Sequence, residues 1–121
     1  MPMRQMNEWH SLSFSAIILR EIMDHPLEDE TRQSRLKQVG MMNILYYMHV
    51  GRTPLTVTNI INETGLTRGG VTETIDYLVQ RELLTETQVK NSMGRGRARQ
   101  FEIVRRIFEK TSPFQEVASS Q

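Results

Sequence analysis

Cysteine is absent from the 121 residues of the chain. This absence excludes a disulfide scaffold, thiolate catalysis, a cysteine-ligated zinc site and cysteine redox sensing. Long apolar runs are missing too, because the longest, Ala16–Leu19, is far shorter than the ~20 residues that span a bilayer. The N-terminus also lacks the apolar stretch of a secretory signal. We therefore expect a cytoplasmic protein that does not contact a membrane.

Sequence signatures of catalysis are missing as well. The chain contains no nucleophile elbow, P-loop or dinucleotide fingerprint, and Gly94-x-Gly96 lacks the strand-to-helix setting of a phosphate loop. The adjacent carboxylates Glu28, Asp29 and Glu30 are expected to form a solvated charge run rather than a metal site. We therefore expect no enzymatic activity, no metal and no cofactor.

The charges that are present are unevenly distributed. The net charge is only +1, but the stretch from Glu21 to Glu30 holds five acids and no Lys or Arg. The stretch from Lys90 to Arg106 holds six bases against one acid, which leaves a net charge of +5. Such a local asymmetry favours a polyanion-binding surface. The alternative is a solvated hairpin tip that its arginines keep soluble.

Residues 9–24 have the spacing of a helix with two apolar rows. One row is Phe14, Ile18 and Ile22, and the other is Trp9, Leu12, Ala16, Leu19 and Met23. A helix that is apolar on two sides is buried on two sides, and in so small a protein we expect the second row to contact another subunit. The alternative is a central helix of a monomer. Pro26 and the acids up to Glu30 are expected to form a loop.

A second helix is expected over 33–50, with Gly51 at its C-cap. Its inward residues are predicted to be Leu36, Val39, Ile44, Leu45 and Met48. His49 is expected at the surface of the helix end.

The stretch from Pro54 to Leu84 has the pattern of a helix-turn-helix. Thr56 is a good N-cap for a short helix with a buried face of Val57, Ile60 and Ile61. Gly65 supplies the left-handed conformation of a tight turn, which Leu66 is expected to fill. Thr67 caps a second helix whose apolar face is Val71, Ile75, Leu78 and Val79. A short helix, a glycine turn and a longer helix are typical of this motif.

Two strand-like segments follow the second helix at once. Leu84–Lys90 is rich in Thr and Val, and Arg99–Val104 alternates in polarity. The residues between them, 91–98, form a glycine-containing tip with several arginines. The fold class is therefore mainly α with a small β-hairpin, a winged helix-turn-helix in which this hairpin is the wing. We divide the chain into a dimerisation helix and acidic loop (1–30), a winged-helix domain (31–110) and a flexible tail (111–121).

The sequence resembles the MarR-like winged-helix transcriptional regulators over about residues 36–104. The matching segments are Pro54-Leu55-Thr56, Gly65-Leu66-Thr67-Arg68, Val71-Thr72, Ile75-Asp76-Tyr77-Leu78 and Arg81-Glu82-Leu83-Leu84. The resemblance implies two-fold symmetric dimers that control promoters through palindromic operators, and a small-molecule effector pocket between the dimer helices and the wing domain. Two features depart from the family: only 17 residues follow Val104, and Gly-Arg-Gly-Arg-Ala-Arg replaces the usual Asp–Arg pair of the wing.

In this geometry the start of the second helix enters the major groove of double-stranded DNA. Thr67 and the free N–H groups after it would hold a phosphate, and Arg68 could contact guanine. Thr72 is a candidate contact to a base or a phosphate, and Glu73 could accept a hydrogen bond from a cytosine amine. The predicted DNA contacts on the two helices are Thr56, Thr67, Arg68, Gly69, Gly70, Thr72 and Glu73.

Gly69 and Gly70 are costly inside a helix, and we interpret them as a place where the backbone approaches DNA closely. The alternative is a helix that begins late, at Gly70 or Val71. Asp76 is expected to pair with Arg81 or with a base of the wing.

The wing is expected to supply most of the affinity, through Lys90, Arg95, Arg97 and Arg99. Four phosphate contacts predict a salt slope of roughly −3.6 per subunit. The sequence therefore predicts a homodimeric, sequence-specific repressor. The alternative, which Glu73 and Asp76 favour, is a winged helix that binds a protein instead of DNA.

Overall fold

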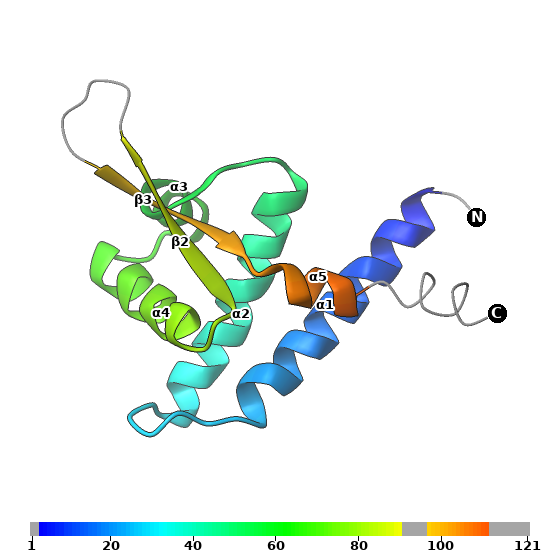
Figure 1. Ribbon diagram of the computed structural model, residues 1–121, viewed down its shortest axis with the longest axis horizontal. Coiled ribbons are helices and arrows are strands. Elements are labelled where there is room, and N and C mark those ends of the chain that lie inside the picture. Colours follow the sequence, from blue (N-terminus) through cyan, green and yellow to red (C-terminus); the bar gives the residue numbers. More distant parts are fainter. Residues whose placement is uncertain (1–2, 91–96, 112–121) are drawn as a thin grey trace.

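The computed structural model describes the backbone of residues 3–90 and 97–111, and within these the side chains of 10–87 and 99–111. The described chain is mainly helical and carries a small three-stranded antiparallel sheet (Figure 1). The elements in order are α1 (Met3–Met23), α2 (Arg32–Val50), β1 (Leu55–Thr56), α3 (Val57–Thr64), α4 (Arg68–Gln80), β2 (Leu84–Lys90), β3 (Arg97–Ile103) and α5 (Arg105–Lys110).

The first helix lies antiparallel beside α2 (Figure 1). It begins six residues earlier than the sequence pattern predicts and ends at Met23. Its row of Phe14, Ile18 and Ile22 is fully buried, as expected. Of the second row, Leu12, Ala16 and Leu19 are exposed and Met23 is half-buried, while the side chain of Trp9 lies outside the described residues. Only one row of α1 therefore packs inside this chain.

The second helix has the predicted C-cap at Gly51, and Thr31 caps its N-terminus by accepting from the amide of Ser34. The prediction that Leu36 points inward is wrong, because its side chain is exposed. The buried row of α2 is Gln38, Met41, Met42, Leu45 and Met48. At about 100° per residue, Leu36 lies on the opposite side of the helix from this row.

The predicted turns and caps of the helix-turn-helix are confirmed. Thr56 and Thr67 cap α3 and α4 by accepting from the amides of Asn59 and Gly70. Gly65 ends α3 in the left-handed region, with φ at 71°. Because α4 begins at Arg68, the alternative of a later start is wrong. The prediction that Leu66 fills the turn is also wrong, since its side chain is exposed.

The sheet has the strand order β1-β3-β2, and both pairings are antiparallel. The first predicted strand, Leu84–Lys90, is confirmed, and the second begins two residues earlier than expected, at Arg97. Cross-strand pairs run from Leu84 opposite Ile103 to Lys90 opposite Arg97. The two-residue β1 was not predicted; it pairs Leu55 with Phe101 and so ties the start of α3 to the sheet.

The chain forms a further short helix, α5, where the sequence pattern predicted no element. Its Ile107 is fully buried, and the ring of Phe108 stacks on His49 with centroids 4.8 Å apart. His49 is exposed, as predicted. The predicted flexible tail lies outside the described residues, apart from Thr111, which is buried. None of the described helices has the length and hydropathy to cross a bilayer.

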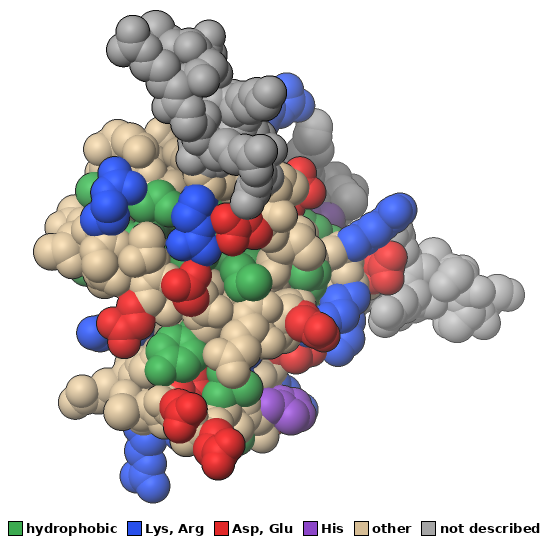
Figure 2. Space-filling view, turned by 60° about the vertical axis from the view of Figure 1, so that its left-hand side comes forward, with side chains coloured by type: hydrophobic (Ala, Val, Ile, Leu, Met, Phe, Trp, Pro, Cys, Tyr) green, Lys and Arg blue, Asp and Glu red, His purple; other side chains and the backbone are tan. Residues whose placement is uncertain are grey.

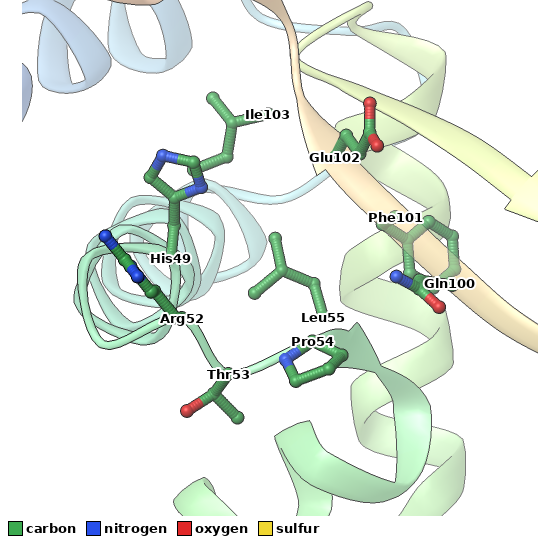
Figure 3. Close-up of a pocket in the computed structure, with 9 residues that line it drawn as sticks. All are labelled: His49, Arg52, Thr53, Pro54, Leu55, Gln100, Phe101, Glu102 and Ile103. Carbon is green, nitrogen blue, oxygen red and sulfur yellow. The ribbon is translucent and has the colours of Figure 1, made fainter.

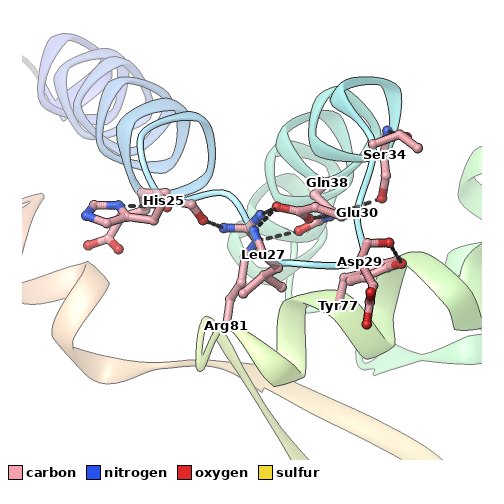
Figure 4. Close-up of polar contacts among 10 residues, drawn as sticks. His25, Leu27, Asp29, Glu30, Ser34, Gln38, Tyr77 and Arg81 are labelled. Carbon is pink, nitrogen blue, oxygen red and sulfur yellow. Dashed lines mark hydrogen bonds and ion pairs between the residues drawn. The ribbon is translucent and has the colours of Figure 1, made fainter.

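The acidic loop between α1 and α2 is not a fully solvated charge run, so this prediction is wrong for Glu30. Its carboxylate is fully buried in an ion pair with Arg81, the residue that ends α4 (Figure 4). The Arg81 guanidinium also donates to the side chain of Gln38 at 2.7 Å and to the carbonyl of His25 at 2.7 Å. The carboxylate in turn accepts from Gln38 and from the amide of Leu27, each at 2.7 Å. We call these groups the Arg81 network; it holds the end of α4 against α2 and the loop.

Candidate nucleic-acid interface

The start of α4 projects exposed groups into solvent. Thr67, Arg68 and Gly69 are all exposed. The first amides of any helix have no intrahelical acceptor, and here Thr67 Oγ1 takes only the amide of Gly70, at 3.0 Å. The amides of Arg68 and Gly69 thus add partial positive charge to that of the Arg68 guanidinium, which forms no ion pair within the described side chains. This end of α4 can hold an anion.

The two glycines at this end have different surroundings. A Cβ added to Gly70 would lie 3.2 Å from Thr67 Oγ1, so this glycine leaves room for the cap. A Cβ on Gly69 would meet nothing within 4 Å. The fold itself therefore does not require a glycine at position 69, and the close approach of DNA there stays a prediction.

The threonines predicted to contact DNA already use their hydroxyls within the chain. The Thr72 hydroxyl donates to the carbonyls of Arg68 and Gly69, at 2.9 and 3.2 Å. Thr56 is half-buried, and its oxygen accepts from the amide of Asn59 at 3.1 Å. The Thr72 hydroxyl would have to rotate to donate to a phosphate, and Thr56 is half-buried, so Arg68 and the free amides are the stronger candidates.

Arg99 joins the outward side of α4 to the hairpin. Its Nη2 lies 2.8 Å from Oδ1 of Asp76 on α4, and its Nε lies 2.9 Å from Oε2 of Glu86 on β2. The guanidinium also lies over the ring of Phe101, 5.2 Å from the centroid. The prediction that Asp76 pairs with a base of the wing is thus confirmed, and the alternative partner, Arg81, binds Glu30 instead.

The charges around Arg99 stabilise one another. The hydrogen bonds that Arg99 donates to Glu86 and Asp76 raise the pKa of its guanidinium above its usual value. The hydrogen bond from Arg99 lowers the pKa of the Glu86 carboxyl. Two carboxylates already pair with Arg99, so it would have to leave them to bind a phosphate, and its predicted DNA contact stays a prediction.

Of the other basic residues predicted for the wing, Lys90 and Arg97 lie at the far end of the two paired strands. Lys90 pairs with Arg97 across the strands, but their side chains, like the whole of Arg95, lie outside the described residues. Over the described part of this side, acidic and basic side chains are intermingled (Figure 2). Glu73 is exposed there, as are Asp76 and Glu86. The described surface is thus not a continuous basic patch.

Glu86 is a residue of this site that the sequence interpretation missed. It shares a face of β2 with the buried Leu84, because alternate residues of a strand lie on the same face. Glu86 is itself exposed, and a carboxylate on the same face as a buried leucine favours a nearby cationic partner. This break in the alternation was the available signal.

Two surface hollows lie on the side of the molecule where α2 ends. One, of about 470 Å³, lies between α1, α2 and α5 and is lined by His10, Tyr46, His49, Val50, Arg52, Phe108 and Thr111. The other, of about 430 Å³, has His49 and Arg52 on one side and Gln100 and Phe101 on the other (Figure 3). The described residues contain no group of three or more potential metal ligands.

No model of a known protein family matches this chain, and no curated protein matches its sequence.

Proposed function

We propose that the chain is a winged helix-turn-helix protein that binds double-stranded DNA in a sequence-specific manner and represses transcription as a homodimer on a palindromic operator. The observation that carries this proposal is the contact of Arg99 with Asp76. It joins the outward side of α4 to the hairpin, so one duplex can meet the start of the helix and the wing together (Figure 1).

The two elements have different tasks in this proposal. Arg68 and the free amides at the start of α4 enter the major groove, where a bidentate arginine contact selects guanine. Lys90, Arg95 and Arg97 supply phosphate contacts that do not depend on sequence. With Arg99 excluded, three such contacts predict a salt slope of roughly −2.7 per subunit, or about −5.4 for a dimer.

A salt titration of DNA binding tests this proposal. Fluorescence anisotropy would be measured with a random duplex and with the DNA upstream of the gene that encodes this chain. We expect both to bind at ~50 mM salt, the upstream DNA more tightly, with the slope given above. Arg68→Ala should cost about 1–3 kcal/mol on the specific site and little on the random duplex. Absence of binding to either duplex at ~50 mM salt would contradict the proposal.

A protein-binding winged helix is the second candidate. Glu73, Asp76 and Glu86 favour it, because three carboxylates on the side that would face DNA repel phosphates. If Glu73 hinders DNA binding, Glu73→Gln should tighten non-specific binding. If neither the wild type nor the Glu73→Gln variant binds any duplex, the second candidate is favoured.

A further inference from the structure

The outward side of α1 is an apolar row without a partner in the described chain. Leu12 is 66% exposed and Leu19 is 48% exposed, and Ala16 lies exposed between them. These residues are three to four positions apart, so they line one side of the helix, away from the buried Phe14 and Ile18. Single exposed leucines are common on surfaces, whereas contiguous exposed apolar patches mark interaction sites.

A second exposed apolar row runs along α2. Leu36 is 60% exposed, Tyr47 is 69% exposed and Val50 is 59% exposed. Together with Gly40 and Asn43 they have the spacing i, i+4, i+7, i+11 and i+14, which keeps them on one side of a helix. Leu36 is thus part of an ordered row rather than an isolated exception.

The two rows adjoin. The Ser15 hydroxyl of α1 donates a hydrogen bond to Asn43 Oδ1 of α2, and the rings of Phe14 and Tyr46 stack with centroids 4.3 Å apart beside it. Ser15 borders the row of α1, and Asn43 belongs to the row of α2. The two helices therefore form one surface, which we call the α1/α2 outer face and which consists of Leu12, Ala16, Leu19, Leu36, Gly40, Tyr47 and Val50.

Gly40 at the middle of this face has no explanation inside the chain. It is central in a 19-residue helix, where glycine costs about 1 kcal/mol relative to alanine. A Cβ added at this position would meet nothing within 4 Å, so no neighbouring group in the chain excludes a side chain. A glycine in open space on a partly apolar row is suited to the close approach of a helix from outside.

We propose that a second copy of this chain docks on the α1/α2 outer face and forms a two-fold symmetric four-helix interface. On a two-fold interface the same patch meets itself, so the small residues Ala16 and Gly40 of one copy can receive the leucines of the other. At 1.5 Å per residue, α2 is about 28 Å long, and two packed helices are about 20 Å wide. The flat area of the face is thus ~560 Å², to which protruding side chains add, and it approaches the ~800 Å² per partner that a standard interface buries.

This inference rests on the proposed dimer and deepens it, since it adds α2 to the α1 row expected from the sequence. The interface leaves the start of α4 uncovered, because no residue of α4 belongs to the face. Both copies can therefore present α4 and the hairpin outside the contact.

Sedimentation velocity of the full chain, without DNA, tests the interface. We expect the wild type to have twice the mass of the 14.1 kDa chain at ~1–100 μM. Gly40→Leu should weaken self-association at least tenfold, because the new side chain fills the centre of the face. Its matched control is Gly69→Leu, the same change at an exposed helical glycine with equally open space. This control should stay dimeric.

Folding must be separated from assembly in this experiment. Circular dichroism should show both leucine variants folded, since leucine is a better helix former than glycine. Leu19→Glu adds a charge to the face from α1 and should also yield a folded monomer. Leu66→Glu, at an exposed leucine outside the face, should stay a folded dimer. A monomeric wild type at ~100 μM, or a dimer that tolerates both Gly40→Leu and Leu19→Glu, would overturn the interface. Loss of DNA binding by a normal dimer would instead contradict only the proposed function.

Discussion

The guanidinium of Arg99 shows how strongly local partners determine the role of a single residue. Two carboxylates and one aromatic ring surround it, at 2.8 Å from Asp76, 2.9 Å from Glu86 and 5.2 Å from the Phe101 centroid. A phosphate that binds Arg99 would have to displace these partners, whereas a phosphate that binds an unpaired surface arginine displaces only water. Arg99 is therefore a residue that fixes the hairpin against α4, and its neighbour in sequence, Arg97, is the better candidate for DNA contact.

Substitutions at these two arginines should affect the salt dependence of DNA binding differently. Arg97→Gln should reduce the magnitude of the slope by about 0.9 per subunit, because one phosphate contact is lost. Arg99→Gln should leave the slope unchanged but weaken binding to all duplexes, since it frees two carboxylates near the DNA. The double variant Arg99→Gln/Asp76→Asn should recover part of that loss. Anisotropy titrations over 50–200 mM salt measure this; equal slope changes for both single variants would refute the assignment.

At the scale of elements, the helices α3 and α4 and the turn between them could be predicted from the sequence because each of their signals acts locally. Thr56 and Thr67 each cap a helix by accepting from an amide three residues later, and Gly65 adopts its left-handed conformation within one turn. Such contacts depend on adjacent residues alone. The two-residue β1 and the six-residue α5 are too short to show a period, so packing against the rest of the fold decides them.

Contacts between residues that are distant in sequence explain why the partners of Glu30 and Asp76 could not be assigned from the sequence. Arg81 and Glu30 are 51 positions apart, and Arg99 is 23 positions from Asp76. No periodicity connects residues so distant in sequence. The sequence predicted that Asp76 pairs with a cation, either Arg81 or a base of the wing. Only the folded chain shows that the partner of Asp76 is Arg99 and that Arg81 pairs with Glu30.

The cap of α4 should contribute measurably to the stability of the protein. Thr67→Ala removes the acceptor for the Gly70 amide, and loss of an N-cap costs about 1 kcal/mol of unfolding free energy. Thr67→Ser keeps the acceptor and is the matched control. Urea denaturation followed by circular dichroism measures both. A Thr67→Ala protein as stable as the Thr67→Ser protein would show that the cap contributes nothing.

At the scale of the whole molecule, ion pairs join the first and the last described helices, α1 and α5. Glu21 on α1 pairs with Arg106 and Lys110 on α5, each at 3.0 Å. Burial alone would raise the pKa of the Glu21 carboxyl, but hydrogen bonds and charge from the two cations outweigh it, so the pKa lies below its usual value of 4.5. The folded state therefore binds this proton more weakly than the unfolded state does.

The pH dependence follows from the sign of this shift. The stabilisation by Glu21 is fully present above pH 4.5, the pKa of the unfolded chain, and is lost as the pH falls through the lower pKa of the folded state. Glu21→Gln should therefore lower the thermal stability at pH 7 and make little difference at pH 3. Thermal denaturation at both pH values tests this. An equal effect of the substitution at the two values would contradict it.

The Arg81 network makes the placement of α4 depend on the loop that follows α1. Arg81 and Glu30 expose only 4% and 0% of their side chains. Burial lowers the pKa of the Arg81 guanidinium, which reflects the cost of removing this charge from water. Hydrogen bonds to Gln38 and to the carbonyl of His25 offset that cost and connect α4 with α2 and the end of α1. The element proposed to read DNA and the helix proposed to form the dimer thus share one buried contact.

A double-mutant cycle tests this coupling. Arg81→Met and Glu30→Gln should each lower the unfolding free energy by about 3–5 kcal/mol, because each leaves buried polar or charged groups of the other residue without a full partner. The double variant should be less destabilised than the sum of the two, since no isolated charge remains. Urea denaturation at pH 7 measures all four proteins. Additive effects would mean that the two residues act independently, and α4 would then be held by its apolar face, Val71, Ile75 and Leu78, alone.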